Sequence, residues 1–164
     1  MKVLVENRTE YTKEMFVELQ RNEWLNGKKK VKGLCYVLTC IYIGFGVFSL
    51  VMKQFPFSIF FFGAGALMFL FVKKGYYWTA KAAFKQIKKS LPPKGYHYLF
   101  FEDYVEMKGE NDKLIKKISY DTITKAYQTN HSYNFFMDNS FFMVSLENFL
   151  KGNSEEMMKI IEKI

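Results

Sequence analysis

The chain has 164 residues, of which 49% are hydrophobic and 24% are charged, and its formal net charge at pH 7 is +8. The positive excess falls in one segment, because twelve lysines and no acidic residue lie between Glu23 and Glu102. The rest of the chain has 12 basic and 16 acidic residues, a balance of −4, so a basic nucleic-acid-binding domain is not indicated. Its two cysteines give no sign of the disulfide framework of a secreted domain.

Residues 1–27 predict a short strand and a helix on the cytoplasmic side. Val3–Val5 is the strand candidate, and Asn7–Thr9 reads as a turn. Thr12 can cap a helix that runs to about Asn26. The apolar stripe of this helix is Met15, Phe16 and Leu19. Because an isolated strand leaves its backbone unpaired, we expect it to pair with the C-terminal domain.

Residues 28–75 predict a transmembrane hairpin. Two uncharged, apolar runs of twenty and eighteen residues, at about 33–52 and 55–72, are separated by Lys53. As helices they are roughly 30 and 27 Å long, close to the thickness of a bilayer core. A cleaved signal peptide would lie nearer the start, and a soluble core hairpin of this length would have a polar face. Glycines at 44, 46, 63 and 65 suit close packing within the hairpin, with homo-oligomerisation as the alternative.

Basic residues flank both runs, whereas the connecting turn holds only Lys53. They are Lys28, Lys29, Lys30 and Lys32 before the first run and Lys73 and Lys74 after the second. Positive residues remain cytoplasmic, so we expect a multi-pass protein of the bacterial inner (plasma) membrane with both termini in the cytoplasm. Trp24 and Trp78 are predicted to contact the headgroup region. The expected partners are therefore the lipid bilayer and its anionic headgroups.

Residues 76–93 predict a basic amphipathic juxtamembrane helix that ends at Pro92-Pro93. Lys81, Lys85 and Lys88 recur on one side of it. Two readings remain open. The helix lies in the interface and contacts anionic lipid, or it extends the second span with a solvated lysine face.

Residues 94–164 change to short aromatic runs with turn residues between them. The expected strands are Tyr96–Phe101, Tyr104–Lys108, Leu114–Ser119, Ile123–Gln128, Ser132–Met137 and Phe141–Ser145. Asn153 and Glu156 form a capping-box arrangement at the start of a last helix. The buried stripe of that helix is Met157, Ile160, Ile161 and Ile164. Strands in series closed by one helix predict an α+β membrane protein with a pleckstrin-homology-like β-barrel or sheet.

Three segments carry a resemblance to a known family. They are Tyr98–Asp103, Ile118–Ile123 and Phe141–Val144 with Phe149. Together with the lysine-flanked hairpin they resemble the YcxB-like small bacterial membrane proteins over nearly the whole chain. The resemblance implies a pleckstrin-homology-like C-terminal part and no defined activity. This chain has Ser145–Asn148 where such proteins often have a proline and a basic residue.

Catalytic patterns are missing from the sequence. His97 and His131 have no metal-ligand spacing around them, and Glu102-Asp103 point to opposite faces of a strand. We therefore expect no enzyme activity, no cofactor and no metal.

The preferred function is a non-enzymatic binding module, anchored in the membrane, for a protein segment or lipid headgroups. Its candidate ligand loop holds Lys108, Lys113, Lys116 and Lys117, with Glu106, Glu110 and Asp112 weakening it. An immunity protein against a bacteriocin or toxin is the alternative. A transport role ranks last, because charged groups inside the spans would mark a pathway and the two apolar runs contain none.

Overall fold

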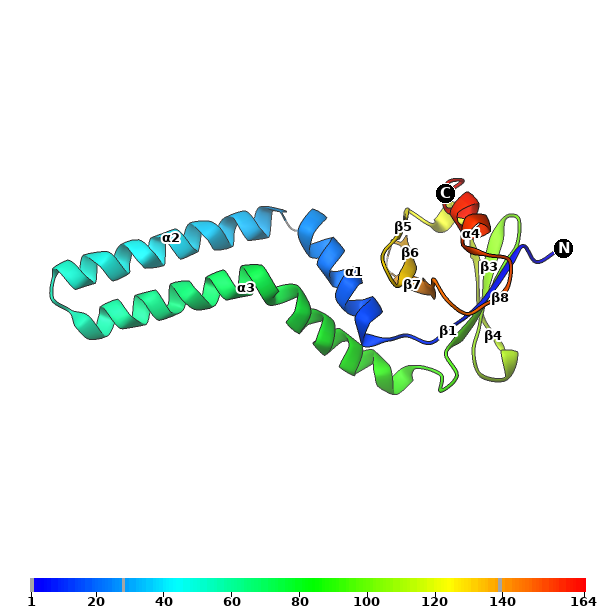
Figure 1. The fold of residues 1–164 in the computed structure, drawn as a ribbon, viewed down its shortest axis with the longest axis horizontal. Coiled ribbons are helices and arrows are strands. Elements are labelled where there is room, and N and C mark those ends of the chain that lie inside the picture. Colours follow the sequence, from blue (N-terminus) through cyan, green and yellow to red (C-terminus); the bar gives the residue numbers. More distant parts are fainter. Residues whose placement is uncertain (1, 28, 139) are drawn as a thin grey trace. The chain divides into compact units, whose positions relative to one another are not determined.

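The computed structural model describes residues 2–27, 29–138 and 140–164. The chain forms two compact units that we describe separately: a hairpin unit, Gln20–Ala82, and a sheet unit made of Met1–Leu19 and Ala83–Ile164. The fold is α+β, with two long apolar helices, antiparallel sheets and a terminal helix (Figure 1). Residues from both sides of the hairpin in the sequence therefore build the sheet unit.

The hairpin consists of α2 (Lys29–Val51) and α3 (Phe55–Ile87), which lie antiparallel (Figure 1). The turn between them is a helix C-terminal motif: Lys53 has φ 55°, and the amide of Gln54 donates to the carbonyl of Ser49 at 2.8 Å. The helix α3 continues through the predicted juxtamembrane segment and passes into a 3₁₀ turn at Lys88–Ser90 before Pro92.

Small residues bring α2 and α3 into contact. A Cβ atom at Gly46 would lie 2.9 Å from the ring of Phe62, and one at Gly65 would lie 3.5 Å from Cβ of Tyr42. The hydroxyl of Ser58 donates to the carbonyl of Gly46 at 2.8 Å. Gly44, in contrast, has no neighbour within 4 Å of the position of its missing Cβ. Packing inside the hairpin therefore uses one glycine of each pair.

Both helices expose most of their apolar side chains. Val51 and Ile59 are each 74% exposed, and Leu67 is 69% exposed. Only 22% and 17% of the most apolar windows of the two helices are buried, whereas the core helix of a soluble protein is mostly buried. By length and composition, these two helices are able to cross a membrane.

The sheet unit contains two antiparallel sheets. The first has the order β4-β3-β2-β1-β8, and the second has the order β5-β6-β7. The strands are β1 (Val5–Thr9), β2 (Tyr96–Phe100), β3 (Tyr104–Lys108), β4 (Leu114–Ser119), β5 (Lys125–Gln128), β6 (Ser132–Met137), β7 (Ser140–Ser145) and β8 (Phe149–Lys151). A turn with left-handed residues at Glu110–Asp112 follows β3, and a 3₁₀ turn at Tyr120–Thr122 follows β4. The two sheets do not close into a barrel, so of the two predicted forms, β-barrel or sheet, the structure has the sheet form.

The N-terminal strand differs from its prediction. Pairing with the C-terminal part is confirmed, since β1 lies between β2 and β8. However, the strand runs over Val5–Thr9, so the predicted turn at Asn7–Thr9 is wrong. Its inward-facing positions alternate as Val5, Asn7 and Thr9, all fully buried. Two of the three are polar, and this made the segment look like a turn.

Buried polar groups join β1 to β7, and we call them the β1–β7 bridge (Asn7, Thr9 and Tyr11). Nδ2 of the Asn7 side chain donates to the carbonyls of Ser145 at 3.1 Å and Glu147 at 2.8 Å. The Thr9 hydroxyl donates to Oδ1 of Asn7 at 2.7 Å and accepts from the amide of Ser145 at 2.9 Å. The Tyr11 hydroxyl accepts from the amide of Met143 at 3.1 Å, and burial raises its pKa to about 12. Side chains of β1 and of Tyr11 thus bond backbone groups of Met143 and Ser145 on the edge strand β7.

Aromatic rings fill the space between the sheets. Phe135 and Phe142 stack with centroids 4.7 Å apart, and Tyr98 stacks on Phe142 at 5.4 Å. The last helix, α4 (Ser154–Ile161), buries Met157 and Ile160 against this core. Its predicted cap is confirmed, because Oδ1 of Asn153 accepts from the amide of Glu156 at 3.0 Å.

The helix α1 (Lys13–Asn26) starts as predicted, with Oγ1 of Thr12 accepting from the amide of Met15 at 3.3 Å. Further along, Glu18 contacts the turn between β5 and β6. Its Oε1 lies 2.9 Å from Nδ1 of His131, and its Oε2 accepts from the His131 amide at 3.1 Å. Partial burial pushes the Glu18 pKa upward, but the hydrogen bonds and charge of His131 hold it below its usual value.

Candidate binding surfaces

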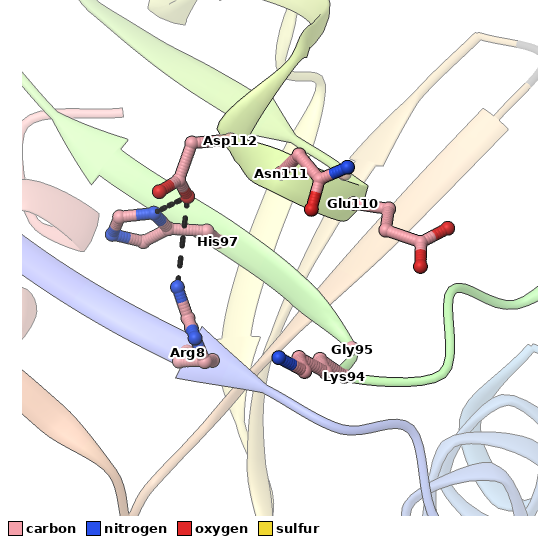
Figure 2. A pocket seen from close by; sticks show the side chains of 8 residues that line it. Arg8, Lys94, Gly95, His97, Glu110, Asn111 and Asp112 are labelled. Atoms are coloured by element: carbon pink, nitrogen blue, oxygen red, sulfur yellow. Dashed lines mark hydrogen bonds and ion pairs between the residues drawn. The ribbon is translucent and has the colours of Figure 1, made fainter.

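The β3–β4 loop, Gly109–Lys113, forms one wall of a pocket of about 200 Å³ (Figure 2). Asn111 and Asp112 in this loop have φ of 56° and 57°, a left-handed conformation that asparagine and aspartate tolerate. Asp112 points toward His97 of β2 and Arg8 of β1, which are neighbours in the β1–β2 register (Figure 2). The loop is therefore held against the centre of the first sheet.

Three charged or ionisable side chains of this pocket, Arg8, His97 and Asp112, contact one another, and His97 also contacts Glu6. Nδ1 of His97 lies 2.7 Å from Asp112, Nε2 of His97 lies 2.8 Å from Glu6, and Arg8 lies 3.5 Å from Asp112. Because carboxylates only accept, His97 makes both hydrogen bonds at once only as an imidazolium. The hydrogen bond from His97 holds the Asp112 pKa below its usual value, helped by the charges of His97 and Arg8. These four groups form a clasp that fixes the loop, and we call them the His97 clasp.

The four lysines of the predicted ligand loop do not converge on one point. Lys108 lies 3.8 Å from Glu106, and the Lys117 ammonium lies 3.6 Å from the centroid of the Tyr104 ring. Lys116 and Lys117 are successive residues of β4 and therefore point to opposite faces of the sheet. Lys113 and Lys116 are exposed. The structure thus divides this set rather than forming a single basic pocket.

The predicted membrane-surface lysines lie at the start of α2 and, after Val72, in α3 and its 3₁₀ turn. Lys29, Lys30, Lys73 and Lys74 are exposed, and Nζ of Lys32 donates to the carbonyl of Leu25 at 3.2 Å. Lys81, Lys85 and Lys88 are exposed on one side of the continuation of α3 and its 3₁₀ turn, while Ala80 is fully buried. Lys28 lies outside the described residues.

The two tryptophans have different surroundings within the hairpin unit. Trp78 is 50% exposed, as an outward-facing ring requires. Trp24 is only 5% exposed, and its indole nitrogen donates to the carbonyl of Val72 at 3.0 Å. Its ring also lies 3.3 Å from the site of a Cβ on Gly75. Trp24 thus packs on α3 instead of facing headgroups. In the sequence, Gly75 is the one indication of this packing, because its missing side chain leaves space for the indole ring.

Sequence reasoning missed the His97 clasp. The sequence shows no metal-ligand spacing around His97, and the residues it meets in the sheet, Glu6 and Arg8, precede it by about 90 positions, so no local pattern links them. Asp112 was read only as a charge that weakens the lysine loop.

Comparison with known proteins gives no family. No family model matches the chain, and a search of curated proteins finds no match. Within the described residues, no group of three or more His, Cys, Asp or Glu side chains is placed to hold a metal ion. The features that remain for a functional proposal are the hairpin, the lysines and the surface of the sheet unit.

Proposed function

We propose that the protein is a non-enzymatic binding module anchored in a bacterial plasma membrane by the α2–α3 hairpin. The observation that carries this proposal is that one sheet contains strands from both sides of the hairpin: β1 precedes α2, and β2, β3, β4 and β8 follow α3. A chain that crosses a bilayer between β1 and β2 must therefore return to the side from which it started. Two exposed apolar helices provide that return.

The charge pattern supports a cytoplasmic location for the sheet unit. Exposed lysines occur at the start of α2 and in α3 after Val72, whereas the connecting turn holds only Lys53. Lysines flanking short membrane segments favour the cytoplasmic side, and each contributes on the order of 1 kcal/mol near an anionic leaflet. Lipid headgroups are accordingly the first partners we propose.

The arrangement of the sheet unit supports a pleckstrin-homology-like module and a YcxB-like relationship. Two antiparallel sheets enclose an aromatic core, and a C-terminal amphipathic helix packs at its edge. Modules of this kind bind through their surfaces. At the His97 clasp, Asp112 of the β3–β4 loop is paired with His97 and Arg8, an arrangement that suits a binding scaffold rather than a catalytic site.

Cysteine labelling in intact bacteria tests the anchor and its orientation. Cys35 and Cys40 are replaced by alanine, and single cysteines are introduced as Lys53→Cys in the turn and Glu155→Cys on α4. We expect a membrane-impermeant maleimide to label the turn variant in intact cells and the α4 variant only after permeabilisation. Labelling of the α4 variant in intact cells, or release of the wild-type protein from membranes by alkaline carbonate, would refute the proposal.

A further inference from the structure

The sheet unit contains a groove of about 410 Å³, and we call it the lysine groove. Its walls are the N-terminal segment before β1, the end of β8 and one side of α4 with the turn that follows it. Its charged lining consists of Lys2, Lys151, Lys159, Lys163 and Glu156. A volume of this size is typical of sites for small molecules.

Backbone geometry at Gly152 shapes the groove. This residue has φ 76°, a left-handed conformation that glycine adopts without strain. A Cβ atom there would lie 2.6 Å from Oε2 of Glu156 and 3.1 Å from the carbonyl of Leu4. The N-terminal segment therefore passes close to the β8–α4 junction, and the amide of Leu4 donates to the carbonyl of Phe100 at 2.8 Å, which fixes it there.

Charge in the lysine groove is not balanced by the protein. Four ammonium groups line it against one carboxylate, and no ion pair within the described residues involves any of the four lysines. Lys151 is opposite Glu6 in the β1–β8 register, but Oε1 of Glu6 lies 2.8 Å from Nε2 of His97 and contacts that residue instead. This contrasts with Lys108 and Lys117, which have an acidic and an aromatic neighbour. Like charges around a concavity repel one another unless an anion lies between them.

The positions of the lysines suit a ligand with several negative oxygens. Lys159 and Lys163 are four residues apart and so lie on one side of the C-terminal segment, while Lys2 and Lys151 come from separate segments. Lysine acts as a flexible point charge with three donors and is a common ligand of phosphate. The carboxylate of Glu156 can accept a hydrogen bond from a hydroxyl group of the same ligand.

We propose that the lysine groove binds a phosphate-bearing anion, either a soluble phosphate compound or the phosphate of a lipid headgroup. This inference rests on the proposed function in that it names the ligand class of the binding module. It differs from the lysine loop predicted from the sequence, whose members point in different directions.

Lysine footprinting of the full chain tests the proposal. The protein is reconstituted in phosphatidylcholine nanodiscs and acetylated with and without inorganic pyrophosphate at constant ionic strength, and each lysine is quantified by mass spectrometry. We expect pyrophosphate to slow acetylation of Lys151, Lys159 and Lys163 at least fivefold and to leave Lys113 and Lys116 unchanged. A second arm replaces pyrophosphate by nanodiscs that contain phosphatidic acid. Protection in the first arm indicates a soluble ligand, and protection only in the second indicates a headgroup.

Matched variants sharpen the result. The double variant Lys159→Gln/Lys163→Gln should weaken pyrophosphate binding about a hundredfold or more, because two charge-assisted hydrogen bonds are lost and each costs about tenfold or more. The control Lys113→Gln/Lys116→Gln removes the same charge from the end of the β3–β4 loop and from β4, and it should bind as wild type. Glu156→Gln removes the opposing carboxylate and should tighten binding, which keeps the test informative even where the double variant folds poorly.

Equal protection of groove and loop lysines, or no protection in either arm, would overturn the proposal. Unchanged affinity in both the double variant and Glu156→Gln would do the same. Failure of the membrane anchor is a separate result, because it appears in the maleimide labelling of the Lys53→Cys variant and not in the footprint.

Discussion

Substitution of Asn7 by alanine should uncouple the two sheets. The Asn7 side chain is fully buried and connects three groups: its amide donates to the carbonyls of Ser145 and Glu147, and its carbonyl accepts from the hydroxyl of Thr9. Alanine removes all three hydrogen bonds and leaves both carbonyls without this donor. No other side chain of the β1–β7 bridge is placed to replace the amide.

The expected cost follows from those contacts. A buried polar group left without its partner costs about 1–3 kcal/mol. The carbonyl of Ser145 loses its donor inside the bridge, while Glu147 is exposed and water replaces part of its loss. We therefore expect Asn7→Ala to destabilise the sheet unit by about 2–4 kcal/mol, a large part of the roughly 5–15 kcal/mol that holds a typical domain folded.

Hydrogen exchange of the full chain in phosphatidylcholine nanodiscs measures this effect locally. The informative amide is that of Ser145, which donates to Oγ1 of Thr9 at 2.9 Å. Its protection should fall by about 30- to 700-fold, since each 1.4 kcal/mol corresponds to tenfold. The control is Asn130→Ala, at an exposed turn position, which should stay within about 0.5 kcal/mol of wild type. A protection factor in Asn7→Ala within about twofold of wild type would refute the bridge argument.

Three further predictions concern backbone, packing and pH. Gly95→Ala should destabilise the sheet unit by about 2–4 kcal/mol, measured by tyrosine near-ultraviolet circular dichroism during urea unfolding, because φ is 74° and a Cβ would collide with the backbone of Thr9. Gly46→Val should lower the thermal stability of the helices in detergent by about 1–3 kcal/mol through overpacking against α3, whereas Gly44→Val, with no neighbour within 4 Å, should not. Asp112 and Glu18 have pKa values held below their usual 3.8 and 4.5, so their stabilisation is complete above those values and is lost as pH falls through the lowered ones. The double variant Asp112→Asn/Glu18→Gln should therefore show a weaker loss of stability in acid than wild type, and an unchanged acid profile would contradict this.

Local signals in the sequence predicted a large part of the fold. Uninterrupted apolar runs identified both long helices, and Thr12 and Asn153 marked helix starts that the structure confirms. Strands β2, β3, β4, β6 and β7 were predicted to within one residue, because aromatic and β-branched residues alternate between clear turn signals. Each of these features depends on neighbours within a few positions.

The features that sequence reasoning missed depend on partners far away along the chain. Asn7 and Thr9 resemble turn residues until Ser145, 138 positions beyond Asn7, provides their hydrogen-bond partners. The three-residue strand β8 is too short to have a periodic pattern. The lysine groove joins Lys2 to Lys163, and nothing in the spacing of single lysines indicates that they converge.

The position of β1 between β2 and β8 also imposes an order on biosynthesis. Val5 pairs with Phe100, which the ribosome adds 95 residues later, or about 5–20 s at usual translation rates. Closing a flexible loop of that length costs roughly 4 kcal/mol of chain entropy. If the hairpin is inserted as proposed, both ends of that loop are already held at the same side of the bilayer. Pairing of β1 with β2 then costs little further chain entropy. Insertion would then precede completion of the sheet. A substitution that prevents insertion of the apolar helices would therefore first impair folding of the sheet unit.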